Sequence, residues 1–512
     1  MRSISIDTET TGLDVVHGAK PFLVTTCSDD GVIHFWEWDV NPLTRQPVIP
    51  PDDLVDITEV LDYFDVIYAH NSKFDVRALA TIGVGLPWDK VRDTLVMGHL
   101  LASNHRHDLT WMCVEYLGAN IEPFEVAIKE VTRACRAIAK RDYPQWLLAE
   151  EGLPGMPSVK DSSKRDEDKP WKNDMWLPRA LLKQIGRADY DKKDLSLEDI
   201  KWLTACSKYA NADSEHTLYL GLEMERLIKE RGLWAIYEHR LQLPRVACEM
   251  ECYGVTAIGT YTDATIQEYE QYVAEESDEL VTIAAEYGHK LELAEGASIN
   301  DNMREFFYGA VRQECSYCSY TKRVKHWTGE MENGEVCPKC AKSTKRRQGM
   351  SHQLEVKRCE NLALPVVYNN KRVNGSLDKE AMAEYLATVD GNAYEFIRLL
   401  LDKRGHDTAL VYMEAYRRFW MPVPGRPGFY RIRPSLNPCA TDHLRWASNS
   451  PNLQNVSGDS KEISNRACFG PLPDREWWRM DFKSIENRIP AYESNQEEMI
   501  ELFERPTEPP YY

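Results

Sequence analysis

The sequence predicts an α/β domain, followed by a helical region and a smaller α+β part. Residues 2–7 alternate between apolar and polar side chains, as a strand does, and residues 21–38 form two strand-like runs around Asp29-Asp30-Gly31. Residues 64–69 form another apolar strand, after which a helix begins. Residues 215–290 and 376–420 then show the spacing of amphipathic helices. Strands followed by helices are typical of an α/β domain joined to further domains.

The composition narrows the class of protein. A chain of 512 residues is too long for one core, which predicts two or three domains. It has no run of about 18 apolar residues and no apolar N-terminal signal, so we expect a cytoplasmic protein with no membrane partner. Its 13 cysteines should then be reduced or metal-bound. The net charge of −19 argues against a generally basic DNA-coating protein, but it allows a local basic groove.

Shifts in composition predict three segments. The first, residues 1–235, is the α/β domain with a mixed central sheet, and it carries an insertion at about residues 120–190. Within that insertion, residues 154–175 are rich in proline, serine and charge, which predicts an exposed loop. Residues 236–430 are mainly helical, and residues 431–512 regain some strand character. We therefore expect three structural parts.

Acidic residues in the first segment are spaced so that they could share a site. Asp7 and Glu9 are two apart on a strand, so both side chains point to one side of it. Asp75 lies near the start of a predicted helix, and Tyr209 and Asp213 are four apart on another. Four carboxylates in one place repel each other unless cations neutralise them, and oxygen-rich sites select Mg²⁺ or Mn²⁺. The pattern predicts a pair of divalent cations that could hydrolyse a phosphodiester.

Each of these spacings is common on solvated strands and helices, and only their conjunction is informative. The three motifs IDTETTGL, HNSKFD and YANAD resemble those of the proofreading exonuclease superfamily with four acidic residues and a tyrosine, over about the first 230 residues. The resemblance implies a ribonuclease H-like fold, two metal ions on the four carboxylates, and a water oriented by Tyr209, with help from Glu9. It also implies contacts to the terminal nucleotide from Thr10, Gly12 and Leu13, supported by Asn71 and Phe74.

The implied reaction is hydrolysis of the last phosphodiester at a DNA 3′ end, with release of a nucleoside monophosphate. Single-stranded or frayed ends suit a site that takes one strand at a time. A further aspartate, Asp93, lies where the superfamily has a D-T pair, and we expect a structural role for it rather than metal binding.

Two motifs near the C-terminal end point to a second activity. They are RWASNSPNLQN, residues 445–455, and WRMDFKSIENR, residues 478–488. In the second, Asp481 ends a predicted apolar strand within WWRMDF, and Glu486 follows five positions later. This spacing suits a metal-binding carboxylate at a strand edge.

The set resembles family A DNA polymerases, the class of bacterial DNA polymerase I and of several bacteriophage replicases. The resemblance implies that Asp481 is one of two catalytic aspartates and binds Mg²⁺. Glu486 would exclude a ribose 2′-OH, and Arg445, Gln454 and Asn455 would contact the primer–template duplex. It also implies that residues 236–430 form the thumb and residues 431–512 part of the palm. The family's T-G-R reads His443-Leu444-Arg445 here, a departure that affects fine geometry.

The resemblance also predicts parts that this sequence does not contain. After Asp481 the family has a fingers helix and an H-D-E motif with the second aspartate, and neither is present. We expect that polymerisation needs a second polypeptide that carries the fingers and the remaining palm, as in a split bacteriophage polymerase. A truncated product, and a remnant that only holds DNA for the exonuclease, are the alternatives.

Four cysteines predict a structural zinc site. Cys315-x2-Cys318 and Cys337-x2-Cys340 are separated by 18 residues, which is the pattern of a zinc ribbon, here over residues 312–350. Four thiolates leave no open position for catalysis. The stretch from Cys315 to Gln348 holds eight lysine or arginine and three glutamate residues. We hypothesise that the ribbon contacts the phosphate backbone of duplex DNA; a docking surface for a partner protein is the alternative.

The sequence therefore predicts a proofreading 3′→5′ exonuclease within a DNA polymerase. A non-catalytic DNA-binding or assembly subunit is a second hypothesis, and the complete set of acidic residues argues against it. A stand-alone RNA-processing exonuclease is a third, and the polymerase motifs argue against that. A nuclease assay would distinguish the first hypothesis from the second.

Overall fold

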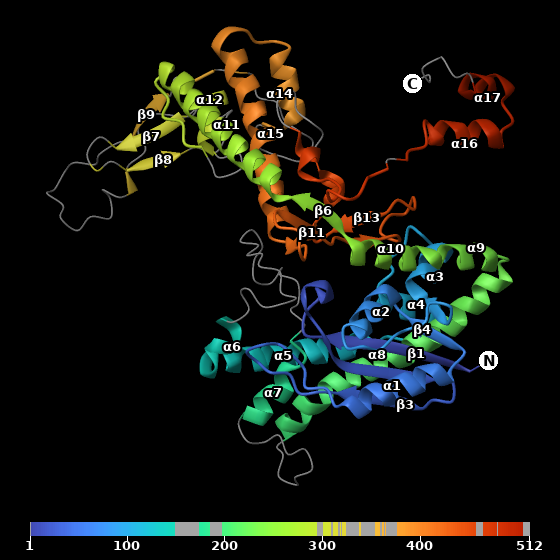
Figure 1. Ribbon diagram of the computed structural model, residues 1–512. Coiled ribbons are helices and arrows are strands. Elements are labelled where there is room, and N and C mark those ends of the chain that lie inside the picture. Colours follow the sequence, from blue (N-terminus) through green and yellow to red (C-terminus); the bar gives the residue numbers. More distant parts are fainter. Residues whose placement is uncertain are drawn as a thin grey trace.

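The computed structural model has one part around β1 and α8 and another around α11 and α15, with α10 and β6 between them (Figure 1). It describes residues 2–148, 174–184, 197–293, 301–308, 311–315, 318, 320–323, 337–338, 354–358, 361–362, 364, 376–456, 464–478 and 480–504. Within these residues, no helix is both long enough and apolar enough to cross a bilayer.

A five-stranded mixed sheet forms the centre of the N-terminal part. Its order is β3-β2-β1-β4-β5, with β1 antiparallel to β2 and parallel to β4. The strands are β1 (Ser3–Thr10), β2 (Pro21–Ser28), β3 (Ile33–Glu37), β4 (Val66–Ala69) and β5 (Val91–Asp93). The predicted mixed sheet is confirmed, and the hairpin around Asp29-Asp30-Gly31 is β2–β3.

Helices cover both faces of this sheet (Figure 1). They are α1 (Pro51–Tyr63), α2 (Ser72–Ala80), α3 (Thr94–Leu101), α4 (Leu109–Leu117) and the long α8 (Leu197–Glu230); a short 3-10 turn, η1, spans Val15–His17. Alternation along β1 divides its side chains: Ile4 and Ile6 join the core under α1, whereas Ser5 faces α8 and donates to the Ser214 carbonyl. Asp7 and Glu9 have the same parity as Ser5, so they lie on the α8 side of β1.

The predicted insertion adds helices to the N-terminal part. α5 (Glu122–Asp142), α6 (Pro144–Leu148) and α7 (Leu177–Gln184) pack with β2 and the start of α8 around the buried Trp176 and Phe22. The exposed loop predicted at residues 154–175 lies outside the described residues except for its last two. Those two, Asp174 and Met175, are buried, and Asp174 pairs with Arg136.

Most residues of the two segments predicted to be helical, 215–290 and 376–420, are helical in the structure. α9 (Trp234–Arg240) and α10 (Gln242–Tyr253) lead into β6 (Val255–Ile258) and the long α11 (Gly259–Glu286). α11 lies against α15 (Gly391–Arg417), with α14 (Lys379–Leu386) beside them (Figure 1). α12 (Asp301–Tyr308) contributes Phe306 and Phe307 to the core with Phe396. A three-stranded sheet, β8-β7-β9, comprises β7 (Val311–Cys315), β8 (Thr321–Arg323) and β9 (Leu354–Arg358).

The C-terminal part has two small sheets. β10 (Met421–Pro422) and β11 (Phe429–Ile432) pair with β6 in the order β10-β11-β6. β12 (Ser435–Asn437) and β13 (Ala447–Asn449) form a hairpin. The remaining elements are η2 (Leu453–Asn455), η3 (Asn465–Cys468), α16 (Ile485–Glu493) and α17 (Glu497–Glu504).

The strand predicted within WWRMDF is wrong for the residues described there. Residues 477–478 and 480–482 form no strand, and the side chains of Trp478, Met480 and Phe482 are 83%, 92% and 79% exposed. The prediction failed because an apolar run becomes a strand only where a neighbouring strand supplies hydrogen bonds and a core covers its side chains. Among the described residues nothing pairs with this segment.

Candidate functional site

Three carboxylates from distant parts of the chain meet where α8 crosses the second half of β1, the middle strand of the central sheet. Asp7 and Glu9 extend from β1, and Asp213 extends from α8. One oxygen from each of the three lies within 4.8 Å of the others. Glu9 and Asp213 are buried, and Asp7 is half-buried. The structure therefore brings together three of the four acidic residues that the sequence singled out.

Hydrogen bonds between the sheet and α8 explain why Asp213 reaches this place. The Ser5 hydroxyl donates to the backbone carbonyl of Ser214 at 2.6 Å, next to Asp213. On β2, the Thr25 hydroxyl donates to the side-chain oxygen of Asn211 at 3.2 Å. Small hydroxyl side chains at these strand positions let the helix lie close to the sheet.

The fourth acidic residue, Asp75, lies beside this group rather than within it. It is buried on α2, and its Oδ1 accepts a hydrogen bond from the Thr8 hydroxyl at 2.8 Å. Burial, and then the charge of Asp7, raise the pKa of Asp75, so the carboxyls of Asp7 and Asp75 are close enough to interact. Thr8 was not singled out from the sequence, although its place between Asp7 and Glu9 on β1 was a possible signal.

Burial and mutual repulsion make these carboxyls hard to ionise. Burial raises the pKa of Asp7 to about 6. Burial, and then the charge of Asp7, raise the pKa values of Asp75 and Asp213 well above their ordinary range. Asp7 Oδ2 is buried and has no hydrogen-bond partner among the residues that the structure describes. Divalent cations such as Mg²⁺ or Mn²⁺ would stabilise these carboxylates in their ionised form, and the buried Asp7 Oδ2 could act as a ligand.

Tyr209 contacts the same group from one turn earlier on α8. A hydrogen bond from its phenol lowers the pKa of Asp213, against the larger effect of burial. Burial, and then the charges of Asp213, Glu9 and Asp7, raise the pKa of Tyr209. The phenol therefore stays protonated and acts as a hydrogen-bond donor.

The residues that the resemblance assigned to the terminal nucleotide lie in two segments, at the end of β1 and at the start of α2. The Thr10 hydroxyl donates to the Gly12 carbonyl at 2.6 Å, which shapes the bend after β1. Leu13, in that bend, is 66% exposed. Asn71 precedes α2 in the left-handed region, with φ of 61°, and is exposed. Phe74 packs against Val15, Ala19 and Ala78.

Asp93 has the structural role that we expected from the sequence. It ends β5 and caps α3, where its Oδ1 accepts from the backbone N–H groups of Leu95 and Val96. Its Oδ2 accepts from both the backbone N–H and the hydroxyl of Ser72, at 2.9 and 2.6 Å. Both oxygens are therefore in use, and the cap joins α3 to the start of α2.

The polymerase-like residues lie in the C-terminal part, in a more open setting. Asp481 and Glu486 are both exposed. Glu486, at the start of α16, forms an ion pair with Arg445 from the loop before β13. The structure thus brings Arg445 and Glu486 together, and it leaves Asp481 outside any helix or strand.

Gln454 and Asn455 shape the loop that holds the PNLQN motif. Gln454 accepts from the Ser448 N–H at 3.1 Å and donates to the Trp446 carbonyl at 3.0 Å. Asn455 donates to the Tyr412 hydroxyl on α15 at 3.4 Å. These bonds tie the motif to the β12–β13 hairpin and to the long helix.

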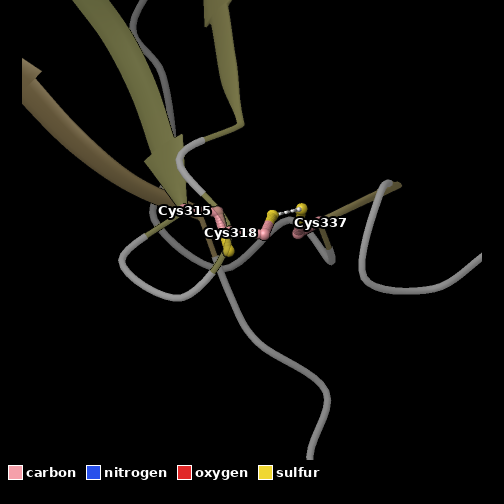
Figure 2. A group of neighbouring side chains, drawn as sticks. All are labelled: Cys315, Cys318 and Cys337. Atoms are coloured by element: carbon pink, nitrogen blue, oxygen red, sulfur yellow. Dashed lines mark hydrogen bonds between the residues drawn. The ribbon is translucent and has the colours of Figure 1, made fainter. Parts of the chain in front are cut away.

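Three of the four predicted zinc ligands lie together, as Figure 2 shows. The sulfurs of Cys315, Cys318 and Cys337 are all within 4.8 Å of one another, and those of Cys318 and Cys337 are 3.5 Å apart. Cys315 and Cys337 are buried. Cys340 lies outside the described residues. The cluster fits a thiophilic cation such as Zn²⁺, because soft thiolates at this separation share one ion.

The sequence reasoning missed one buried charge cluster, formed by Glu251, Lys73 and Arg77. A signal existed on α10, whose buried positions Pro244, Ala247, Cys248 and Glu251 follow the spacing of one helix face. An acidic residue on an apolar helix face indicates a buried partner.

Comparison with known proteins links the C-terminal part to the DNA polymerases. Residues 335–508, about a third of the chain, match the family model described as DNA polymerase family A. Over these residues, which include Asp481 and Glu486, the chain is similar to that family's model. The match does not include the carboxylate group at β1. A search of curated proteins found no match.

One solved structure resembles nearly the whole chain. It is described as the POL domain of Pol1 from M. smegmatis in complex with DNA primer-template and dNTP. The TM-score is 0.57 and the sequence identity 13%, and the alignment covers 98% of this chain and 60% of that chain. At this identity the likeness shows a shared fold, and our chain spans 60% of the other chain's length.

Proposed function

We propose that this protein is a 3′→5′ DNA exonuclease that proofreads for a family A DNA polymerase. The observation that carries the proposal is the group of three carboxylates from β1 and α8, with oxygens within 4.8 Å of one another. Asp75 beside the group and the phenol of Tyr209 complete the set that the superfamily motifs predict. The β1-centred mixed sheet is consistent with the ribonuclease H-like fold that we propose for residues 1–235.

In this proposal, Asp7, Glu9, Asp75 and Asp213 hold two Mg²⁺ or Mn²⁺ ions. Such a pair activates water and stabilises the departing 3′ oxygen of a phosphodiester. Tyr209 donates a hydrogen bond that orients the attacking water. Thr10 and Gly12 shape the backbone that receives the terminal nucleotide, and the exposed Leu13 packs against its base, with Asn71 and Phe74 supporting the opposite side.

A nuclease assay on a labelled single-stranded oligonucleotide in Mg²⁺ tests the proposal. Asp7→Ala should abolish shortening from the 3′ end. Tyr209→Phe should lower kcat by about 10- to 100-fold, because it removes only the orienting donor. Tyr219 is an exposed tyrosine more than two turns further along the same helix. Tyr219→Phe is therefore the matched control and should behave as the wild type. Undiminished activity of Asp7→Ala would remove the assignment.

We further propose that the C-terminal part is a portion of a polymerase active site. Asp481 would bind Mg²⁺, Glu486 would exclude ribonucleotides, and Arg445, Gln454 and Asn455 would contact the primer–template duplex. A second polypeptide with the fingers and the remaining palm would complete the site. The exposed Trp478, Met480 and Phe482 support this proposal, since apolar side chains of that size are normally covered by a partner.

The cysteine cluster suits a structural zinc site. Cys315, Cys318, Cys337 and Cys340 would hold one Zn²⁺ and fix the tip of the sheet that contains β7 and β8. The lysine- and arginine-rich sequence around it favours contact with the DNA backbone over a protein partner. Deleting the ribbon should reduce the salt dependence of duplex binding, and an unchanged slope would favour the protein partner.

A further inference from the structure

A fully buried glutamate joins the N-terminal part to the C-terminal part. Glu251, on α10, has a side chain that is 0% exposed. Its Oε1 accepts from Lys73 Nζ and from the Leu436 backbone N–H, both at 2.5 Å, and its Oε2 pairs with Arg77. Lys73 Nζ also donates to the Leu436 carbonyl at 2.6 Å. Three elements from separate regions of the sequence therefore meet on one carboxylate.

Helix α2 presents opposite faces to this cluster and to the carboxylate site. Lys73 and Arg77 are four residues apart, so they share one face, and both contact Glu251. Asp75 lies two residues from each, about 200° around the helix, and accepts from Thr8 on β1. Any rotation or shift of α2 away from Glu251 would therefore move Asp75 relative to Asp7.

The cluster of Glu251, Lys73 and Arg77 also contacts the β12–β13 hairpin of the polymerase-like part. Leu436 is the middle residue of β12, which pairs with β13. The Ser448 N–H on β13 is held in turn by Gln454 of the PNLQN motif. The contact chain thus runs from Asp75, through α2 and Glu251, to the segment that contains PNLQN.

The charges make this junction cooperative. A buried carboxylate is tolerated only when it is paired, and a buried lysine or arginine likewise. Glu251 has its partners only when α2 and β12 are both docked against α10, so loss of either contact weakens the other. We propose that Glu251 is a positioning residue that makes the geometry of the carboxylate site depend on docking of the β12–β13 hairpin. This inference rests on the proposed exonuclease function.

Kinetics of 3′-end hydrolysis by the full chain test this positioning role. In Glu251→Gln, kcat should fall by about 10- to 100-fold, with little change in KM for the oligonucleotide, because a small displacement of Asp75 is costly. Glu251→Asp should recover part of the loss. Glu249→Gln, an exposed acid on the same helix paired with Arg245, is the matched control and should keep wild-type kinetics. Wild-type kcat in a folded Glu251→Gln protein would overturn the proposal.

Amide hydrogen exchange separates this proposal from the nuclease assignment. In Glu251→Gln, amides of α2 and of residues 435–437 should both exchange faster than in the wild type, whether or not the protein cleaves DNA. Lys73→Met provides a second variant if Glu251→Gln does not fold, since Glu251 keeps Arg77 as its partner. Faster exchange in α2 alone, with β12 unchanged, would disprove the coupling. If the wild-type protein did not cleave DNA but Glu251→Gln still sped up exchange in both α2 and β12, the exonuclease function would be disproved and the coupling through Glu251 would stand.

Discussion

At the residue scale, the carboxylate group is a cluster of like charges that the fold holds together against repulsion. Burial raises the pKa of Asp7 to about 6, from an ordinary value of 3.8, and Asp7 raises the pKa values of Asp75 and Asp213 further. Without cations, repulsion between the ionised carboxylates therefore destabilises the folded state at neutral pH. Bound cations relieve that repulsion, which favours their binding.

The loss of folding stability that these buried carboxyls cause depends on pH. Because the folded-state pKa of Asp7 is raised, the folded state binds the proton more tightly, and stability falls as pH rises from about 4 to about 6. In EDTA at pH 7, Asp7→Asn should therefore unfold at a higher temperature than the wild type, by about 1–3 kcal/mol in free energy of unfolding. The difference should vanish near pH 4. Thermal denaturation followed by circular dichroism measures it, and identical curves at both pH values would contradict the explanation.

At the element scale, α8 depends on a close approach to β4. The ring of Tyr68 lies against Gly221, where a Cβ would come within 2.7 and 2.8 Å of its Cγ and Cε1. The Tyr68 hydroxyl donates to Glu225, one turn further on, at 2.6 Å. This contact sets the distance between α8 and the sheet, and therefore the place of Tyr209 and Asp213.

Gly221→Ala should destabilise the fold. The new methyl group would overlap the Tyr68 ring, at a cost of about 1–3 kcal/mol, and chemical denaturation would measure the loss. Gly405→Ala is the matched control, because a Cβ there meets nothing within 4 Å in the middle of α15. That change should be neutral or stabilising by up to about 1 kcal/mol. Equal effects of the two changes would show that the contact with Tyr68 does not matter.

The cysteine cluster allows a second prediction at this scale. The purified chain should contain one zinc per molecule by elemental analysis, because four thiolates in two C-x2-C pairs form a closed tetrahedral site. Cys318→Ser and Cys340→Ser should each lose the metal. Cys252→Ser, an exposed cysteine outside the cluster, should retain it. A metal-free wild type prepared without chelators would contradict the prediction.

At the scale of the whole molecule, the two candidate sites differ in how complete they are. The exonuclease-like site has its carboxylates assembled and largely buried, whereas the polymerase-like site has Asp481 exposed beside uncovered Trp478 and Phe482. This difference in burial supports the proposal that a second polypeptide completes the polymerase-like site.

We therefore expect the chain by itself to shorten a DNA 3′ end without extending it. A primer–template with all four dNTPs and Mg²⁺ should yield only shortened products, because one aspartate cannot hold both polymerase cations. Gel analysis of a labelled primer measures both directions at once. Net extension by this chain alone would contradict the need for a second polypeptide.

The sequence by itself determined the local elements and the chemistry of the candidate site. Alternation in residues 2–7 and the helical spacing of residues 215–290 and 376–420 are properties of neighbouring residues, so they were visible without a structure. The parity of Asp7 and Glu9 likewise placed both on one side of β1. The two C-x2-C pairs identified the cysteine cluster for the same reason.

Only the tertiary structure decided which distant groups meet. It placed Asp213 within the group and Asp75 beside it, and it paired Glu251 with Lys73 and Arg77. It also left Trp478, Met480 and Phe482 exposed and outside any strand. Each of these outcomes depends on whether elements that are far apart in the sequence pack together and bury each other's side chains. Side-chain periodicity reports which face of an element is apolar, but the partner that covers that face is a property of the whole fold.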